Sequence, residues 1–156
     1  MKPEPVFAQA ADAEQLRSIF QDYGMDLSGP IHDHVVIRDG ETIIGGAKLI
    51  QLERDYFFLE VFGISQKYRH KGYGSLILSH ITANPWQYCR ELKSRPGVSV
   101  PYSIGTLSKG KAKDFYLSHG FLPVDFASIP EPYNQQCTFC PDREECQPVP
   151  LLFSKS

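Results

Sequence analysis

An apolar run that ends in a short basic loop, followed by a helical pattern, organises the chain. Residues 57–64 read FFLEVFGI, with Glu60 as the one charge among them, and this predicts a strand. Polar residues 65–68 follow, and residues 69–74 then read RHKGYG. Residues at helical spacing come next: Leu76, Ile77, His80 and Ile81. The predicted order is strand, loop and helix, with the helix over residues 73–83.

The chain before this run predicts a strand, a helix and a hairpin. Residues 6–8 form a short strand, and Asp12 is a suitable N-cap for a helix that ends before a glycine- and proline-bearing loop at 24–32. Residues 35–37 and 42–47 flank an Asp-Gly turn, which is typical of a hairpin. The second strand of this hairpin is expected to continue through the apolar residues that follow it, as far as Leu52.

The chain after the central helix is patterned less regularly. An insertion at 84–97 carries a second short helix, at 86–93, for which we infer no function. The elements expected after it are, in order, a strand at 98–104, a helix from an N-capping Ser108 to Ser118, a strand from Phe121, an irregular segment at 127–147 and a last strand at 149–153. Antiparallel strands followed by strand, loop and helix indicate a mixed α/β sheet.

Composition restricts the class of protein. The chain has 156 residues, which suits one domain (residues 1–156) with its own core. Hydrophobic residues make up 42% and charged residues 22%, as in globular proteins. The net charge of -2 argues against a general nucleic-acid binder. We expect no membrane span and no signal peptide, and therefore a cytoplasmic protein.

The basic loop has the features of a phosphate site. A helix N-terminus presents unpaired N–H groups and the positive end of the helix dipole. Gly72 and Gly74 allow a ligand close to the backbone, and Arg69, His70 and Lys71 add positive charge. The spacing matches neither the P-loop nor the dinucleotide fingerprint. On the loop alone, a pyrophosphate cradle at 69–75 and an ordinary strand-to-helix turn are both open.

Two motifs resemble one known family. The R-x-x-G-x-G pattern of residues 69–74 after an apolar strand resembles the acyl-coenzyme A loop of the GNAT superfamily of N-acetyltransferases. Residues 112–121, AKDFYLSHGF, are similar to a later motif of the same superfamily. The resemblance covers about residues 4–125. It implies an α/β (α+β) fold with a mixed, mostly antiparallel sheet of six to seven strands flanked by helices, and acetyl-coenzyme A as cosubstrate.

The resemblance also implies a set of binding residues. Two strands would splay to admit the thioester arm, which the backbone of residues 62–64 would bind as an added strand, with the N–H of Ile64 as oxyanion donor. Lys109 stands where the family often has Asn, and either meets a phosphate or points into water. The cofactor-binding residues are therefore expected to be Phe62, Gly63, Ile64, Arg69, His70, Lys71, Gly72, Tyr73, Gly74, Ser75 and Lys109.

Two side chains are candidates for proton transfer. Glu60 is the one charge in its strand and is expected to share a face with Phe58, Phe62 and Ile64, where partial desolvation suits a base. The alternative is a charge at a solvent-facing strand edge. Leu59–Phe62 reads LEVF, which resembles the family pattern that carries a base, and Tyr116 matches the tyrosine that the family places near the thioester sulfur as an acid. The alternative for Tyr116 is aromatic packing.

The function that follows is transfer of an acetyl group from acetyl-coenzyme A to a primary amine, by direct attack in a ternary complex. The sequence does not identify the acceptor amine, although Asp26 and Asp33 in the 24–34 region suit a cationic amine. Two alternatives remain open: a non-catalytic coenzyme A-binding or regulatory module, and a metal- or redox-sensing protein. A homodimer is also left open.

The cysteines motivate the last alternative. Cys137, Cys140 and Cys146 fall within ten residues, and with Cys89 or His119 they have the residue types of a zinc site. A full zinc signature shows two such pairs, and here one is visible. The pattern also suits a catalytic cysteine or a redox sensor. We favour reduced thiols and predict no metal. His32 and His34, which alternate at the start of a strand, are expected at the surface.

Overall fold

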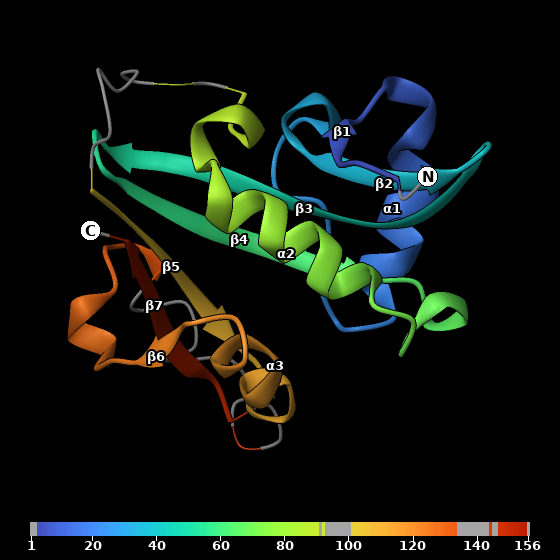
Figure 1. Ribbon diagram of the computed structural model, residues 1–156. Helices are drawn as coiled ribbons and strands as arrows, with labels where there is room; N and C mark the ends of the chain where they lie inside the picture. The colour runs from blue at the N-terminus through green and yellow to red at the C-terminus, as the bar shows by residue number, and fades with distance from the viewer. Residues whose placement is uncertain (1–2, 91, 93–100, 134–143, 145–146, 156) are drawn as a thin grey trace.

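The protein forms a seven-stranded sheet within the residues described by the computed structural model, 3–90, 92, 101–133, 144 and 147–155 (Figure 1). The strands are β1 (Val6–Phe7), β2 (Val35–Asp39), β3 (Thr42–Glu53), β4 (Tyr56–Ile64), β5 (Tyr102–Ser108), β6 (Leu122–Pro123) and β7 (Val149–Lys155). Their order is β1-β2-β3-β4-β5-β7-β6, and within the described residues only the β4–β5 pair is parallel. The predicted mixed, mostly antiparallel sheet is confirmed.

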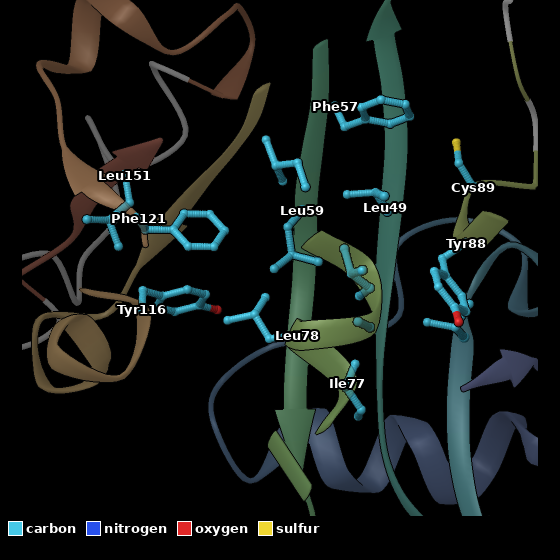
Figure 2. Packing of buried hydrophobic residues seen from close by; sticks show 14 of the residues in the cluster. Leu49, Phe57, Leu59, Ile77, Leu78, Tyr88, Cys89, Tyr116, Phe121 and Leu151 are labelled. Atoms are coloured by element: carbon cyan, nitrogen blue, oxygen red, sulfur yellow. The ribbon is translucent and has the colours of Figure 1, made fainter. Parts of the chain in front are cut away.

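In the described part of the chain, three α-helices cover the two faces of the sheet. They are α1 (Ala13–Gln21), α2 (Tyr73–Ala83) and α3 (Lys113–Leu117). The apolar side of α1 packs on one face, in a core with Val36 and Val61. α2 and α3 pack on the opposite face, and Figure 2 shows Ile77 and Leu78 of α2 against the side chains of β4. The predicted helix at 73–83 has the bounds that its sequence pattern indicated.

The two central strands separate halfway along their length. β4 and β5 pair from Tyr56↔Ser103 to Leu59↔Thr106, and there the pairing ends, although β4 continues for five more residues. The Thr106 hydroxyl donates a hydrogen bond to the Leu59 carbonyl, 3.0 Å away, at the last paired position. Beyond it the strands diverge toward α3 and the start of α2 (Figure 1). The splay expected from the family resemblance is therefore present.

A β-bulge at the point of separation changes the direction of the side chains. Lys48 of β3 pairs with Val61, and the next residue, Leu49, pairs with Leu59, so Glu60 is the extra residue on β4. Leu59 and Phe62 consequently both join the core beneath α2 and α3. Glu60 lies on the same side of the strand as Phe58, because Tyr133 both stacks on the Phe58 ring and donates a hydrogen bond to Glu60.

The expected common face of Glu60 with Phe62 and Ile64 is therefore wrong. Uninterrupted alternation along the strand predicted it, and the bulge breaks that alternation after Leu59. The consequence is useful to a binding site, because the carboxylate and the aromatic core of β4 lie on opposite sides of the sheet.

Two predicted helix caps have other roles. Ser108 is the last residue of β5, paired with Val149 of β7, and α3 begins only after a 3-10 turn at Gly110–Ala112. Asp12 is buried and makes no side-chain cap to α1. Its carboxylate instead accepts hydrogen bonds from the Arg38 guanidinium, at 2.8 and 2.9 Å, and from the Gln9 N–H.

The insertion and the cysteine segment are described only in part. The expected helix at 86–93 is a 3-10 turn, Pro85–Tyr88, and most of the rest of the insertion, together with the first residues of the strand expected at 98–104, lies outside the described residues. Cys137, Cys140 and Cys146 also lie outside them. Elsewhere, none of the helices in the described part of the chain has the length and apolar character needed to cross a bilayer.

Candidate active site

A cavity of about 630 Å³ occupies the space where β4 and β5 separate. Its walls come from the turn after α1, the second half of β4, the loop before α2, the start of α2, the end of β5 and the start of α3. All the residues expected to act in binding or catalysis line it except Lys71, whose side chain is exposed outside the lining. The lining residues among them are Glu60, Phe62, Gly63, Ile64, Arg69, His70, Gly72, Tyr73, Gly74, Ser75, Lys109 and Tyr116.

The loop before α2 presents backbone N–H groups to this cavity. Gly72 is the N-cap of α2 with φ of 88°, a left-handed conformation that glycine adopts without the strain of other residues. The first N–H groups of a helix have no partner within it, so those at the start of α2 are available to an anion. Arg69 lines the same end of the cavity and adds a positive charge.

The beginning of α2 also packs closely on α3. A Cβ on Gly74 would lie 3.3 Å from the Phe115 ring, so no larger side chain fits there without displacing that ring. The Ser75 hydroxyl is hydrogen-bonded to His119 Nε2, 3.0 Å away. The two motifs of the sequence, one on α2 and one on α3, therefore form a single packed unit beside the cavity.

Tyr23 closes the cavity from the side of α1. Its hydroxyl donates a hydrogen bond to the Ile64 carbonyl at 2.5 Å, and the Arg69 guanidinium lies 5.9 Å from the centre of its ring. Burial raises the pKa of Tyr23 against the opposing charge of Arg69, so the hydroxyl remains a donor. No sequence pattern indicated a role for Tyr23, because it lies in the turn after a helix, far from both motifs.

Lys109 does not point into water, as one of the two expectations had it, and its contact with a phosphate stays a prediction. Its ammonium donates a hydrogen bond to the Tyr23 carbonyl, beyond the last residue of α1. The physical reason is that β5 continues to Ser108 and so brings Lys109 opposite the C-terminal end of α1, where carbonyl groups and the negative end of the dipole attract a cation. Lys109 and Tyr23 both line the cavity, and their bond joins its two sides.

Tyr116 on α3 is buried within the aromatic core beside the cavity. Its ring lies 6.3 Å from that of Phe62 and 5.4 Å from that of Phe115. Figure 2 shows its hydroxyl directed toward Leu78 and β4. Burial raises the pKa of Tyr116 far above its ordinary value, although the neighbouring Thr106 hydroxyl lowers it in part. The phenol is therefore neutral at physiological pH.

Glu60 lies between two partners that the sequence had not connected with it. The Lys48 ammonium is 3.0 Å from Oε1, and the Tyr133 hydroxyl donates a hydrogen bond to Oε2 at 2.7 Å. The side chains of Lys48 and Glu60 are only 11% and 14% exposed. Oε1 is buried and receives no aligned hydrogen bond, so its contact with Lys48 is one of charge rather than of hydrogen-bond geometry.

Tyr133 covers this pair from the side of Phe58. Its ring stacks on that of Phe58 with 4.0 Å between the centres. Burial and the adjacent Glu60 carboxylate both raise the pKa of Tyr133 well above its ordinary value, so the hydroxyl is a permanent donor to Glu60. Lys48 had a detectable signal, since it is the one charge in the run from Thr42 to Leu52. Tyr133 had none, because it belongs to a proline-rich irregular segment.

The loop that precedes β2 is fixed by a buried histidine. Contrary to expectation, His34 is fully buried. Its Nε2 accepts a hydrogen bond from the Ser28 N–H at 3.1 Å, so its Nδ1 carries the proton and donates to the Pro30 carbonyl, 3.0 Å away. Burial lowers the pKa of His34, and the charge of Lys48 lowers it further. Across the described residues, no group of three or more metal-binding side chains is assembled.

Comparisons with known proteins agree with this geometry. Residues 30–123, more than half of the chain, match the model of the acetyltransferase (GNAT) domain family. A comparison with curated protein sequences finds no match.

Solved structures share the fold. N-acetylglutamate synthase from Neisseria gonorrhoeae, complexed with coenzyme A and N-acetyl-glutamate, aligns with a TM-score of 0.74 at 16% identity, over 99% of this chain and 35% of its own. The chain thus spans about a third of that protein. Naa50 from Arabidopsis thaliana, in complex with the bisubstrate analogue CoA-Ac-MVNAL, aligns with a TM-score of 0.61 at 15% identity, over 100% and 99% of the two chains.

A third structure is the ribosomal-protein-S18-alanine N-acetyltransferase from Escherichia coli, with a TM-score of 0.65 and 13% identity over 99% of this chain and 95% of its own. Identities this low carry the fold alone. The family follows from the match over residues 30–123, together with the splayed strands and the loop before α2. The chain belongs to the GNAT family of acetyltransferases, whose cosubstrate is acetyl-coenzyme A.

Proposed function

We propose that the protein transfers the acetyl group of acetyl-coenzyme A to a primary amine, by direct attack of the amine in a ternary complex. The observation that carries this proposal is the coincidence of three features in one cavity: an edge of β4 without a strand partner, the N-terminus of α2 and the side chain of Tyr116. Each suits a different part of the cosubstrate or of the reaction.

Two features of the cavity support acetyl-coenzyme A as its ligand. The N–H groups at the start of α2 and the Arg69 guanidinium suit a diphosphate. Residues 62–64 have their β3 edge paired and no β5 partner on the other edge, where Tyr23 bonds only the Ile64 carbonyl, so the remaining backbone groups suit the amides of a pantetheine arm. The arm would then extend toward Glu60 and Tyr116, which line the same cavity.

The chemistry assigns one proton transfer to each of these two residues. A C–N bond forms between the acceptor amine and the acetyl carbon as the C–S bond breaks. Glu60 accepts the proton that the amine nitrogen loses, and Tyr116 protonates the departing thiolate. The N–H of Ile64 stabilises the oxyanion. Exchange with solvent returns the proton from Glu60 to Tyr116, and an acceptor that binds as an ammonium releases its additional proton to solvent before the attack, so the cycle balances.

The acceptors of the similar proteins suggest an α-amine. The synthase structure holds N-acetyl-glutamate, and the Naa50 analogue joins coenzyme A to the peptide MVNAL. An α-amine is common to both, one in a free amino acid and one at a peptide N-terminus. The Lys48–Glu60–Tyr133 group adjoins the cavity from the side of the loop at 24–34, which we propose as the acceptor side.

Thiol release tests this proposal. Purified protein with acetyl-coenzyme A and a panel of amines should liberate free coenzyme A only when a suitable amine is present, and mass spectrometry should find that amine acetylated. Binding of acetyl-coenzyme A without release of thiol for any amine would favour the alternative of a non-catalytic coenzyme A-binding module. A protein that does not bind acetyl-coenzyme A at all would contradict both.

A further inference from the structure

The Lys48–Glu60 pair bears on the kind of amine that the site accepts. The two side chains come from neighbouring antiparallel strands and carry opposite charges 3.0 Å apart. Glu60 lines the main cavity, and Lys48 lines a second cavity of about 320 Å³, so the pair lies between the two. Both charges are therefore placed next to space that a ligand can enter.

The loop at 24–34 comes close to the Lys48 ammonium. A Cβ on Gly29 would lie 3.3 Å from Nζ, and Gly29 itself has φ of 74°. A residue without a side chain thus lets the backbone approach the ammonium, while the His34 ring, held neutral by its two hydrogen bonds, adds no second cation there. Lys48 is the charge that this loop covers.

We propose that the acceptor is a free α-amino acid, whose ammonium binds Glu60 while its carboxylate binds Lys48. The proposal rests on the proposed function and deepens it by naming the class of acceptor. It makes Lys48 the specificity-determining residue of the site, a role that neither motif of the sequence indicates.

Each charge of the Lys48–Glu60 pair needs a partner of opposite charge, because both side chains are largely shielded from water. An ammonium that binds Glu60 Oε1 competes with the Lys48 ammonium, which lies 3.0 Å from the same oxygen. If the amine brings no negative charge, Lys48 is left unpaired with only 11% of its side chain exposed, which is strongly unfavourable. An α-amino acid carries its ammonium and its carboxylate on the same carbon. When it binds, the Lys48–Glu60 ion pair is replaced by two ion pairs between the protein and the ligand.

The same argument separates an amino acid from a peptide N-terminus. In a peptide, or in an amino-acid amide, the group beside the amine is a neutral carbonyl, which cannot replace the Glu60 carboxylate as a partner of Lys48. A site built to pair with a charged group rejects a close analogue that lacks the group. We therefore expect kcat/KM to be at least about tenfold higher for an amino acid than for its amide.

The test is a comparison of matched acceptors on the wild-type protein. Initial rates of thiol release are measured with acetyl-coenzyme A and each standard amino acid, its amide and its N-terminal dipeptide with glycine. At neutral pH the amide has the larger fraction of free amine, so the comparison is biased against the proposal. A preference for the free acid supports it. A preference for amides or dipeptides overturns it and leaves the proposed acetyl transfer intact, whereas no transfer to any amine overturns both.

Two variants assign the preference to Lys48. Lys48→Met should bring the ratio of acid to amide down to about one, because the partner of the carboxylate is lost. Lys48→Arg keeps the charge and should keep the preference. Lys155→Met, at the exposed end of β7, is the matched control and should leave the ratio unchanged. An unaltered ratio in Lys48→Met would make the ion pair purely structural and overturn the proposal.

Discussion

The Lys48–Glu60 pair should be visible as a coupling energy in protein stability. Glu60→Gln removes the negative charge and leaves the Lys48 ammonium beside a neutral amide. Breaking a fully buried ion pair costs about 3–5 kcal/mol. Because the two side chains are 11% and 14% exposed, we expect the lower value of about 2–3 kcal/mol. The midpoint of thermal unfolding should fall by roughly 5–10 °C for a domain of this size.

The double variant Lys48→Met/Glu60→Gln distinguishes an ion pair from two independent residues. Each single variant leaves one charge without its partner, whereas the double variant leaves none. Urea unfolding followed by circular dichroism should therefore give a double variant whose loss of stability is smaller than the sum of the two single losses, with a coupling of about 2 kcal/mol. Lys155→Met should change the free energy of unfolding by less than about 0.5 kcal/mol. Strictly additive losses in the double variant would refute the reasoning.

Four further predictions follow from the site and its supports. Tyr116→Phe should lower kcat by about a hundredfold and leave the calorimetric affinity for acetyl-coenzyme A within a factor of two; a large loss of affinity would mean that the residue serves packing alone. Glu60→Gln should lower kcat/KM most from acidic to neutral pH, where the acceptor amine is protonated, and equal rates there would remove Glu60 from the mechanism. Gly74→Val should weaken acetyl-coenzyme A binding at least about tenfold, because a Cβ at this position already lies 3.3 Å from the Phe115 ring and the two methyl groups would displace that ring; unchanged calorimetric titrations would contradict this. Asp12→Asn should destabilise the fold by about 1–3 kcal/mol at pH 7, measured by urea unfolding at a series of pH values.

The pH dependence of the last variant has a defined sign. Burial by itself raises the pKa of Asp12, but the Gln9 N–H and the Arg38 guanidinium outweigh it and hold the pKa below its ordinary value. The stability that the ionised carboxylate contributes is therefore present above pH about 4 and is lost as the pH falls through the lowered pKa. The difference between wild type and Asp12→Asn should shrink as the pH is lowered below 4. A constant difference would show that the carboxylate acts through packing only.

Hydrophobic periodicity and turn residues predicted the helices and strands that depend on neighbouring residues in the chain. The helix at 73–83, the hairpin of β2 and β3 and the strand at 56–64 all follow from periodicity and turn residues within a few positions of each other. The loop at 69–75 and the position of Tyr116 beside the cavity followed from two motifs. Such features are carried by residues that lie next to one another in the chain.

The structural features that the sequence did not predict depend on contacts between segments that are distant in the chain. The bulge at Glu60 is a property of the pairing between β3 and β4, and alternation within one strand does not reveal it. Tyr133 reaches Glu60 across 73 positions of sequence, and Lys109 reaches Tyr23 across 86. Lys48 is recognisable in the sequence as a lone charge in an apolar strand, but its partner, Glu60, is evident only from the pairing of β3 with β4.

A crystal structure of the protein with coenzyme A is the most direct test of the central claim, that the splayed strands and the start of α2 form the cosubstrate site. The account predicts the diphosphate within hydrogen-bond distance of the N–H groups of residues 72–75, and the pantetheine arm paired with residues 62–64, with its sulfur near Tyr116. Coenzyme A bound elsewhere on the protein, or bound with the gap between β4 and β5 empty, would contradict it.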